Sequence, residues 1–450
     1  MTDLARQIDG GRNPGDDFGA ETRDIGAEMC DFASRIFPYP RSISGQGVRD
    51  TLRAIRDYLP DLVIHEVPTG SACFDWIVPD EWNIRDAYIA DMNGRRIVDF
   101  KANNLHVVGY SESIDVVLDR VELDKHLHSL PDMPDAIPYV TSYYRRTWGF
   151  CVTQEQRAAM TDPRYRVVID STLGAGSLTY ADLLIPGETE REILLSTYTC
   201  HPSMANNEVS GPTLATFLAR TLAQRKNRYT YRIVFVPETI GPIIYMSRHL
   251  DAMKKNMLAG FILTCVGDDR AFSYMPSRRG DTIADNIARL TLARYAPDFV
   301  TYDFLRDRGS DERQYCSPGA DLPVVSVMRT KYGRYPEYHT SKDDLTVISA
   351  QGFAKSFHVY LKMFENLERT TVWQAVNVGE PQLSKRNYRD AIGGQRGPLA
   401  DRFRLISDVL ATADGRMDNL TLATLTGRTF EDIERVCEML AQDGLVRRIL

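Results

Sequence analysis

The sequence has few cysteines, and none of them are closely paired. Seven cysteines are scattered through 450 residues, and no two of them stand in a Cys-x-x-Cys spacing. An odd and dispersed set excludes a disulfide framework and argues against a structural zinc knot. Free thiols of this kind are typical of a reducing compartment, so the sequence predicts a cytoplasmic protein.

Long apolar runs are missing as well. No stretch approaches the about 20 apolar residues that a membrane-spanning helix needs. Residues 1–20 are polar and contain several glycines and aspartates, unlike the apolar centre of a secretory signal. We therefore expect neither a membrane partner nor an export signal.

An excess of positive charge is the third feature that the sequence lacks. Lys and Arg number 54 against 61 Asp and Glu, which gives a net charge of −7. A net acidic chain has no bulk attraction to nucleic acid or to anionic membranes. With 43% hydrophobic and 26% charged residues, the composition is that of a globular protein. At this length we expect two or three domains.

The texture of the sequence divides the chain into four parts. Residues 1–22 are polar and are expected to form a disordered lead. Over 65–172, short β-favouring runs alternate with turn signals; these runs include 87–89, 96–98, 105–110 and 136–140. This stretch is predicted to be a mainly β domain inserted into an α/β domain. The α/β domain is assigned to 23–64 and 173–380, and a separate C-terminal domain to 381–450.

Strand and helix patterns alternate in the predicted α/β domain. Buried-strand patterns cover 193–199, 232–236, 260–266 and 323–327. Between the first two, a helical pattern over 211–222 follows Ser210 as a capping residue and has Pro212 in its first turn. The alternation predicts a mixed, mostly parallel sheet sandwiched by helices.

Polar side chains stand at the ends of these strands. His201 and Glu208 follow the first strand, Glu238 follows the second, Asp311 precedes the fourth and His339 follows it. In an open α/β sheet the ligand site lies beyond the carboxyl ends of the strands. We therefore expect these side chains to meet at one rim of the sheet.

These residue types suit a catalytic metal. Neutral imidazole is a standard zinc donor, and a catalytic zinc takes about three protein ligands, so His201 and His339 are the candidate histidine ligands. Glu208 or Asp311 could supply a carboxylate, and Glu238 could act as general base on a water. Each residue also has a structural interpretation: Glu238 could pair with the helix that follows it, and Asp311 could cap a helix over 312–316.

The order and surroundings of these residues resemble the zinc aminopeptidases with co-catalytic metals, which include glutaminyl cyclases and glutamate carboxypeptidases. More closely, the chain resembles bacterial proteins with an aminopeptidase-like domain, a β insertion and a C-terminal winged helix. The resemblance covers nearly the whole chain after residue 25 and implies the zinc exopeptidase fold. It rests on Phe74-Asp75-Trp76, Pro79-Asp80-Glu81-Trp82, Asn104-Leu105-His106, Cys200-His201-Pro202-Ser203-Met204-Ala205-Asn206-Asn207, Pro237-Glu238-Thr239-Ile240-Gly241 and Tyr338-His339-Thr340-Ser341.

The chain departs from the two-metal pattern of that family at the ligand positions. The bridging Asp of the pattern, which precedes a Ser-Gly helix start, corresponds to Asn206-Asn207. The second glutamate of the pattern corresponds to Thr239, and the Asp that closes the next strand corresponds to Thr264. Because amides and hydroxyls are weak ligands, the resemblance implies one zinc ion or none. The residues left to hold one ion are His201, His339, and Glu208 or Asp311.

Several side chains near these loops are candidates for binding substrate. The arginines are Arg278, Arg279, Arg306 and Arg308, and guanidinium groups bind carboxylates through two hydrogen bonds. Tyr338 could line the pocket or donate a hydrogen bond to a developing oxyanion. The corresponding prediction is an acidic or peptide-terminal substrate. The alternative is that these arginines are solvated surface residues.

The C-terminal segment, 381–450, carries three helical patterns and a short strand pattern, an order that suggests a winged helix. It has 11 Lys and Arg against 10 Asp and Glu, and three acids stand beside one base at the start of the candidate recognition helix, 429–435. Phosphate contacts need several cations. We therefore expect this segment to pack, to dimerise or to dock a partner rather than to bind nucleic acid, and a homo-oligomer is compatible with that role.

The combined prediction is a metal-dependent amide-bond hydrolase, aminopeptidase-like or deacylase-like, acting on a small peptide or an N-acylated amino acid. Glu238 would activate a water beside one zinc ion. The alternative follows from Asn206, Thr239 and Thr264 at ligand positions: an exopeptidase scaffold without metal that binds a small ligand or serves a regulatory role.

Overall fold

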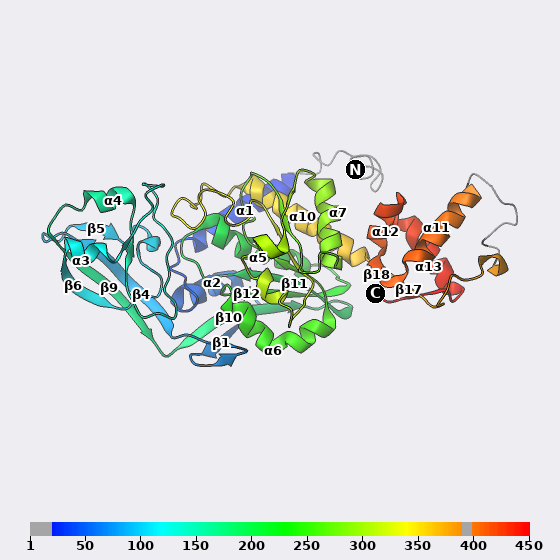
Figure 1. Cartoon of the computed structure of the whole chain (residues 1–450), viewed down its shortest axis with the longest axis horizontal. Helices are drawn as coiled ribbons and strands as arrows, with labels where there is room; N and C mark the ends of the chain where they lie inside the picture. The colour runs from blue at the N-terminus through cyan, green and yellow to red at the C-terminus, as the bar shows by residue number, and fades with distance from the viewer. Residues whose placement is uncertain (1–19, 387, 389–397) are drawn as a thin grey trace. The chain divides into compact units, whose positions relative to one another are not determined.

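The computed structural model describes residues 20–386, 388 and 398–450 (Figure 1). They form two compact units. Of the described residues, the larger unit comprises Ala20–Gly280 and Asp298–Tyr360, and the smaller unit comprises Asp281–Pro297 and those that follow from Leu361. Of the expected disordered lead, residues 1–19 lie outside the described residues, and helix α1 (Ala20–Ile36) includes the last three. None of the described helices is long and apolar enough to cross a membrane.

An eight-stranded mixed sheet forms the centre of the larger unit. The strand order is β1-β10-β12-β11-β13-β16-β14-β15. The four middle strands are parallel: β12 (Tyr229–Val236), β11 (Thr189–Tyr198), β13 (Met257–Ile262) and β16 (Val324–Met328). The outer strands are β1 (Val63–Pro68), β10 (Ser177–Ile185), β14 (Ser273–Met275) and β15 (Val300–Thr301). Because β10 and β14 run antiparallel to their inner neighbours, the sheet is mixed but mostly parallel at its centre, as predicted.

Helices cover both faces of this sheet. Helix α5 (Ser210–Ala223) connects β11 to β12, and α6 (Ile240–Asn256) connects β12 to β13 on the far side of β11. These two crossovers run in opposite directions across the sheet, so the right-handed rule puts their helices on opposite faces. Figure 1 shows α5 and α6 on either side of the middle strands. Each middle strand is therefore buried on both faces, which explains its nearly continuous apolar sequence.

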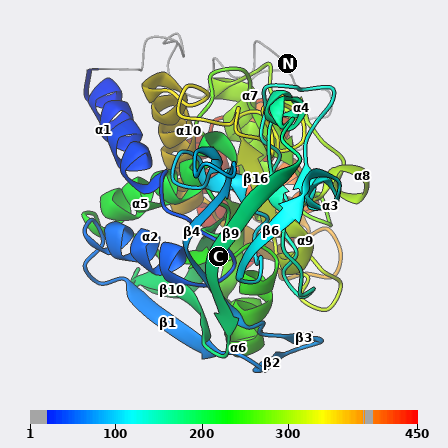
Figure 2. The same ribbon diagram turned by 90° about the vertical axis from the view of Figure 1, so that its left-hand side faces the viewer.

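The β insertion is built on a four-stranded antiparallel sheet, visible in Figure 2. Its order is β5-β4-β9-β6, with β5 (Arg96–Asp99), β4 (Glu81–Ala90), β9 (Arg164–Gly174) and β6 (Ile114–Asp119). Short helices α3 (Arg120–Asp124) and α4 (Gln154–Ala159) join the strands, and the hairpin β2–β3 (Ala72–Cys73, Trp76–Ile77) precedes them. Strand β9 leads directly into β10 of the large sheet.

Two details of the predicted insertion differ from the structure. The proposed boundary at residue 65 falls inside β1, which pairs with β10 and so belongs to the large sheet. The runs 105–110 and 136–140 are not strands of a sheet. The first begins with the short 3-10 helix η1 (Asn104–His106), and both contribute only isolated bridges, one of which joins Pro138 to Thr340. Their β-favouring residues serve loop contacts instead.

The smaller unit has the predicted winged-helix order. Strand β17 (Val372–Ala375) is the middle of a three-stranded antiparallel sheet with β18 (Asp414–Asp418) and β19 (Val446–Arg448). Helices α11 (Pro398–Thr412), α12 (Asn419–Thr426) and α13 (Phe430–Gln442) pack on it around a core that includes Trp373, Ile406, Ile433 and Leu440. Since β17 lies before residue 381, this domain begins about ten residues earlier than predicted. The unit also contains α7 (Ile283–Tyr295) and the end of α10 (Ala350–Arg369) from Leu361 onward, which the sequence assigned to the α/β domain.

Candidate active site

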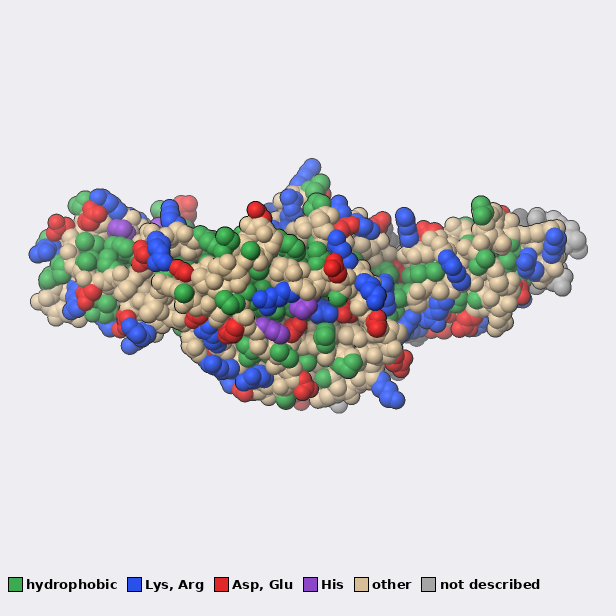
Figure 3. Space-filling model, turned by 90° about the horizontal axis from the view of Figure 1, so that it is seen from below, with side chains coloured by type: hydrophobic (Ala, Val, Ile, Leu, Met, Phe, Trp, Pro, Cys, Tyr) green, Lys and Arg blue, Asp and Glu red, His purple; other side chains and the backbone are tan. Residues whose placement is uncertain are grey.

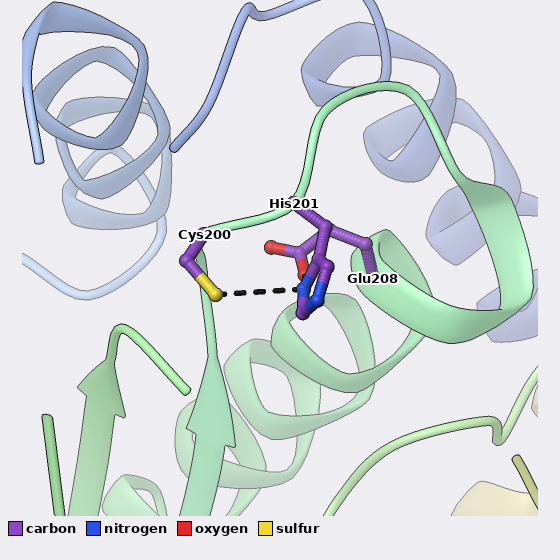
Figure 4. Close-up of side chains that lie close together, drawn as sticks. All are labelled: Cys200, His201 and Glu208. Carbon is purple, nitrogen blue, oxygen red and sulfur yellow. Dashed lines mark hydrogen bonds and ion pairs between the residues drawn. The ribbon is translucent and has the colours of Figure 1, made fainter. Parts of the chain in front are cut away.

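His201 lies just beyond β11 and is held from behind by two charged side chains. Its Nδ1 is 2.8 Å from Glu208 Oε2, and its main-chain oxygen accepts a hydrogen bond of 2.9 Å from Arg41 Nε. Arg41 Nε is also 3.6 Å from Glu208 Oε1, and all three residues are buried. Figure 4 shows Glu208 against the His201 ring. Because Nδ1 is hydrogen-bonded to Glu208, the ring nitrogen of His201 that remains to bind a metal or a ligand is Nε2, on the opposite side of the ring.

Glu238 faces that free nitrogen. It follows β12, and its Oε2 is 3.4 Å from His201 Nε2. The next residue, Thr239, has φ 66° and ψ −68°, a conformation that a β-branched residue adopts only under strain. In this conformation the Thr239 N–H faces Asp311 and donates a hydrogen bond of 2.7 Å to its Oδ1. Asp311 is fully buried, and its Oδ2 has no hydrogen-bond partner among the described residues.

His339 enters the same space from the loop after β16. Its ring centroid is 5.5 Å from that of His201, and the ring of Tyr139 lies 5.1 Å from each of them. Tyr338 stacks on His339 with a centroid distance of 3.9 Å. His339 also has a positive φ of 56°. Its main-chain oxygen accepts a hydrogen bond of 2.9 Å from the Tyr139 N–H, so the insertion holds the His339 loop.

Burial and charge set the protonation of this cluster. Burial raises the pKa of Glu238, against the charges of His201 and Arg313, and burial together with the charge of Glu238 raises the pKa of Asp311 well above its usual range. Burial opposes the charged form of His201, but the hydrogen bond and charge of Glu208 outweigh it and raise the pKa of His201. Burial and the charge of His201 lower the pKa of His339 to about 3. His339 is therefore neutral at pH 7.

His201 and His339 are the two residues of this cluster that could share a single divalent cation, whereas their donor atoms and those of Asp311 do not form a group within 4.8 Å of one another. Two imidazoles on one zinc ion have ring centroids about 5 Å apart, given Zn–N distances of about 2 Å, and the separation between His201 and His339 is close to that. Asp311 adds a buried carboxylate oxygen that lacks a partner among the described residues. Glu208 is a poorer ligand, because it is bonded to Nδ1 and so lies behind the ring. A carboxylate in that position orients the histidine and fixes its tautomer.

Cys200, His201 and Glu208 offer donor atoms within 4.8 Å of one another. Cys200 Sγ is 3.4 Å from His201 Nδ1 and accepts a hydrogen bond of 3.1 Å from the Glu238 N–H. Burial raises the pKa of the Cys200 thiol well above its usual value, with the charges of Glu208 and Glu238 adding to the effect. A neutral thiol beside an occupied Nδ1 supports the main chain around the site, and it is a weak metal donor.

The positions at which the two-metal pattern has carboxylates carry neutral side chains that are hydrogen-bonded within the protein. The Asn207 amide donates to the Tyr198 hydroxyl at 2.8 Å, and the Thr264 hydroxyl donates to the Asn207 main-chain oxygen at 3.1 Å. The Thr239 hydroxyl accepts a hydrogen bond from Arg313. Asn206 donates through its amide to Asp268. These four side chains contribute no carboxylate, so they do not fit the two-metal arrangement.

The other predicted binding residues lie in different places. Arg278 and Arg279 both pair with Asp321. Asp321 precedes β16, whereas His201 follows the parallel strand β11. The two arginines therefore lie at the end of the strands opposite to His201. Arg308 is exposed and donates to main-chain oxygens of its own helical turn, α8 (Phe304–Asp307). Of the predicted binding residues, Tyr338 is the one in contact with the cluster, through His339.

Four residues of the site went unrecognised in the sequence. Arg41 and Tyr139 come from segments 160 and 62 positions away from His201 and carry no motif. Asp343 accepts hydrogen bonds from the main-chain N–H groups of Asn206 and Asn207, and so fixes the turn η2 (Ala205–Val209) that bears Glu208. Arg313 could have been found from its position, because it lies two residues after the candidate site residue Asp311.

The fold defines the class of this protein as aminopeptidase-like. The zinc aminopeptidase of Bacillus subtilis superposes with a TM-score of 0.54 at 12% identity, over 77% of this chain and 94% of that one. The peptidase M28 precursor of Shewanella amazonensis superposes with a TM-score of 0.52 at 10% identity, over 76% and 96% of the two chains. At such identities the likeness concerns the fold alone. It confirms the predicted zinc exopeptidase scaffold.

The chain belongs to the family described as "Domain of unknown function (DUF4910)", whose profile matches residues 30–370. A winged helix-turn-helix profile matches residues 371–448. A Clostridium acetobutylicum protein is 42% identical over 427 residues, covering 95% of this chain and 97% of that one. Its provisional name is polysaccharide biosynthesis protein with aminopeptidase-like domain. A crystal structure from the same organism, titled provisionally as a peptidase, has a TM-score of 0.81 at 41% identity, over 95% and 98% of the chains.

Proposed function

We propose that this protein is a hydrolase of amide bonds that uses one divalent cation, and that Glu238 is its general base. The observation that carries the proposal is the 3.4 Å approach of Glu238 Oε2 to His201 Nε2, with the His339 ring 5.5 Å from that of His201. The ligands we assign are His201 and His339, completed by the carboxylate of Asp311 or Glu208. When bound, a zinc ion polarises the amide carbonyl and lowers the pKa of a water.

Each protein group has a defined task in the proposed reaction. Glu238 accepts a proton from the attacking water, whose oxygen bonds to the acyl carbon, and the proton passes to the amine nitrogen as the C–N bond breaks. The raised pKa of Glu238 suits both halves of that transfer near neutral pH. Glu208 holds His201 in the tautomer with Nε2 free. Tyr139 and Tyr338 pack beside the histidines and limit access of water.

The proposed substrate class rests on the scaffold and on the chemistry of the site. An aminopeptidase-like scaffold with one water-activating carboxylate suits a small peptide or an N-acylated amino acid. The second candidate function is binding of such a molecule without hydrolysis. Asn206, Thr239 and Thr264, at positions where the two-metal pattern has carboxylates, are the specific reason to keep it.

The proposal is tested by measuring zinc content, thermal stability and turnover of the whole protein. We expect about one zinc per chain and a rise in Tm on adding zinc. We also expect hydrolysis of some members of a panel of N-acetyl amino acids and dipeptides. Glu238→Gln should abolish hydrolysis but keep the zinc, whereas Glu190→Gln, an exposed change at the start of β11, should affect neither. Absence of zinc binding contradicts the proposal, and zinc binding without turnover of any panel member favours the second candidate.

A further inference from the structure

Arg313 presents an exposed guanidinium group beside Thr239, the residue that follows Glu238. It lies on the short helix α9 (Glu312–Tyr315), two residues after Asp311, and is exposed. Its Nη2 donates to the Thr239 hydroxyl at 2.7 Å. The other arginines near this rim behave differently: Arg270 pairs with Glu337, and Arg334 pairs with Asp307. Arg313 makes no such ion pair within the described part of the chain, so most of its five N–H donors remain available.

The position of this guanidinium is fixed relative to the general base. Thr239 is tied to Asp311 through its N–H and to Arg313 through its hydroxyl, and it directly follows Glu238. The positive charge of Arg313 is felt by three groups of the site. It partly offsets the effect of burial on the pKa of Glu238, of Asp311 and of Tyr338. The exposed guanidinium of Arg313 therefore lies near the partly exposed Glu238 and the buried Asp311.

The chemistry of a guanidinium indicates what that anion is. Arginine binds a planar carboxylate through two parallel hydrogen bonds, a geometry that lysine and amide side chains do not reproduce. In an N-acyl amino acid, a single carbon separates the amide nitrogen from the carboxylate. An amide under attack beside Glu238 would therefore have its carboxylate within a few ångströms, on the side of Arg313. A residue within a longer chain has no carboxylate there.

We infer that Arg313 binds a substrate carboxylate adjacent to the scissile amide, so that the substrates are N-acyl amino acids or the C-terminal residues of small peptides. This inference rests on the proposed hydrolase function. It distinguishes the protein from an enzyme that removes N-terminal residues from long peptides, because the second residue of such a peptide continues as a chain. Arg313 thus selects the carboxyl end of the substrate.

The test compares a free carboxylate with a carboxamide in otherwise identical probes. N-acetylglycine, N-acetylleucine and N-acetylglutamate are each titrated against their α-carboxamides into the full-length Glu238→Gln protein, with and without zinc, by isothermal calorimetry or ligand-observed NMR. For at least one pair we expect the carboxylate to bind tenfold or more tightly. Adding Arg313→Gln should abolish the preference, and Arg313→Lys should retain part of it. Arg53→Gln, an exposed arginine on helix α2 (Gln46–Arg56), is the matched control.

Two results overturn the inference: equal or absent binding of both members of every pair, or a preference that survives Arg313→Gln. Turnover by the wild-type chain separates this failure from failure of the proposed function. If amides are hydrolysed with no dependence on the carboxylate or on Arg313, only the present inference fails. If the carboxylate preference depends on Arg313 but no probe is ever hydrolysed, the hydrolase assignment fails, and the protein is a carboxylate-binding scaffold.

Discussion

The contact of Glu208 with Nδ1 of His201, and not with Nε2, decides the role that we assign to its carboxylate. Glu208 lies seven residues after His201, and its carboxylate contacts Nδ1 of that ring at 2.8 Å and Arg41 at 3.6 Å. The carboxylate therefore balances the charge of a buried arginine and directs Nε2 toward Glu238. This role differs from direct ligation, although both uses place a carboxylate next to the histidine.

Replacing Glu208 by Gln should weaken zinc binding without abolishing it. The amide oxygen of Gln can still accept a hydrogen bond from Nδ1, but the negative charge that supports His201 and faces Arg41 is lost. We expect zinc affinity to fall by about 10- to 100-fold, the usual effect of removing a carboxylate that orients a metal-binding histidine. Competition titration with a zinc indicator measures it, and Glu190→Gln is the control. Complete loss of zinc would instead identify Glu208 as a ligand.

The sequence predicts part of this site for a physical reason. His201 and Glu238 stand next to ends of buried strands and His339 lies in the loop after another, and parallel strands bring their carboxyl ends to one rim. Arg41 and Tyr139 could not be found in this way, because they reach the site through tertiary contacts that leave no periodic pattern. Arg278 and Arg279 were predicted to bind substrate, but they lie away from the site. The reason is that β14, which precedes them, runs antiparallel to β16, and its short sequence does not indicate this direction.

At the level of elements, Arg49 links three parts of the larger unit. It lies on α2 and donates to Glu66 of β1 at 3.0 Å and to Glu81 of β4 at 2.7 Å. It thus joins the edge of the large sheet to the first strand of the β insertion sheet. The hydrogen bonds from Arg49 lower the pKa of Glu81 from its ordinary value of 4.5 to about 2.

Replacing Glu81 by Gln should therefore change how stability depends on pH. Because the folded pKa of Glu81 is depressed, its contribution is present above about pH 4.5 and is lost as the pH falls toward 2. We expect the variant to be less stable than the wild type by about 1.5–3 kcal/mol at pH 6, the range for a hydrogen bond to a charged group. That difference should shrink as the pH falls from 5 to 3. Urea unfolding at each pH measures it, and a pH-independent difference would contradict the argument.

The strongly patterned elements were predictable and the short ones were not. The four middle strands and α5 have long apolar patterns that tertiary context does not override. The runs 105–110 and 136–140 have strand-like composition, but their main chains bond to loops, so composition and outcome diverge. Strand β17 has only four residues, and its sequence gives no sign that it pairs with β18 and β19 more than 35 positions later.

On the scale of the whole molecule, the winged-helix unit has the element order of a nucleic-acid-binding domain but lacks the positive charge that such a domain needs. Helix α13 begins with Glu431 and Asp432, and Glu434 on its inner side accepts hydrogen bonds from Asn419 and the Thr371 hydroxyl. On the face of the molecule in Figure 3, positive and negative side chains are interspersed. We propose that this unit serves packing or docking.

The full-length protein should therefore not bind duplex DNA. Useful affinity requires several phosphate contacts from cations, and these contacts make binding strongly dependent on salt. We expect no change in the fluorescence anisotropy of a labelled random duplex at 50 mM salt and micromolar protein. A change in anisotropy that weakens steeply with added salt would contradict this prediction. A mixture with a known DNA-binding winged-helix protein serves as the positive control.

The pairing of the insertion with the His339 loop has a consequence for synthesis of the chain. Tyr139 donates its N–H to His339, and Ser341 donates its N–H to Ile137, across about 200 positions of sequence. Arg41, His201, Glu238 and Asp311 all leave the ribosome earlier than His339, and contacts of such long range form late in folding. A nascent chain that ends before His339 therefore contains Glu238 and His201 but lacks the second histidine of the proposed cation site. If the proposed function holds, that site is completed only after His339 has been synthesised and its loop has paired with the insertion.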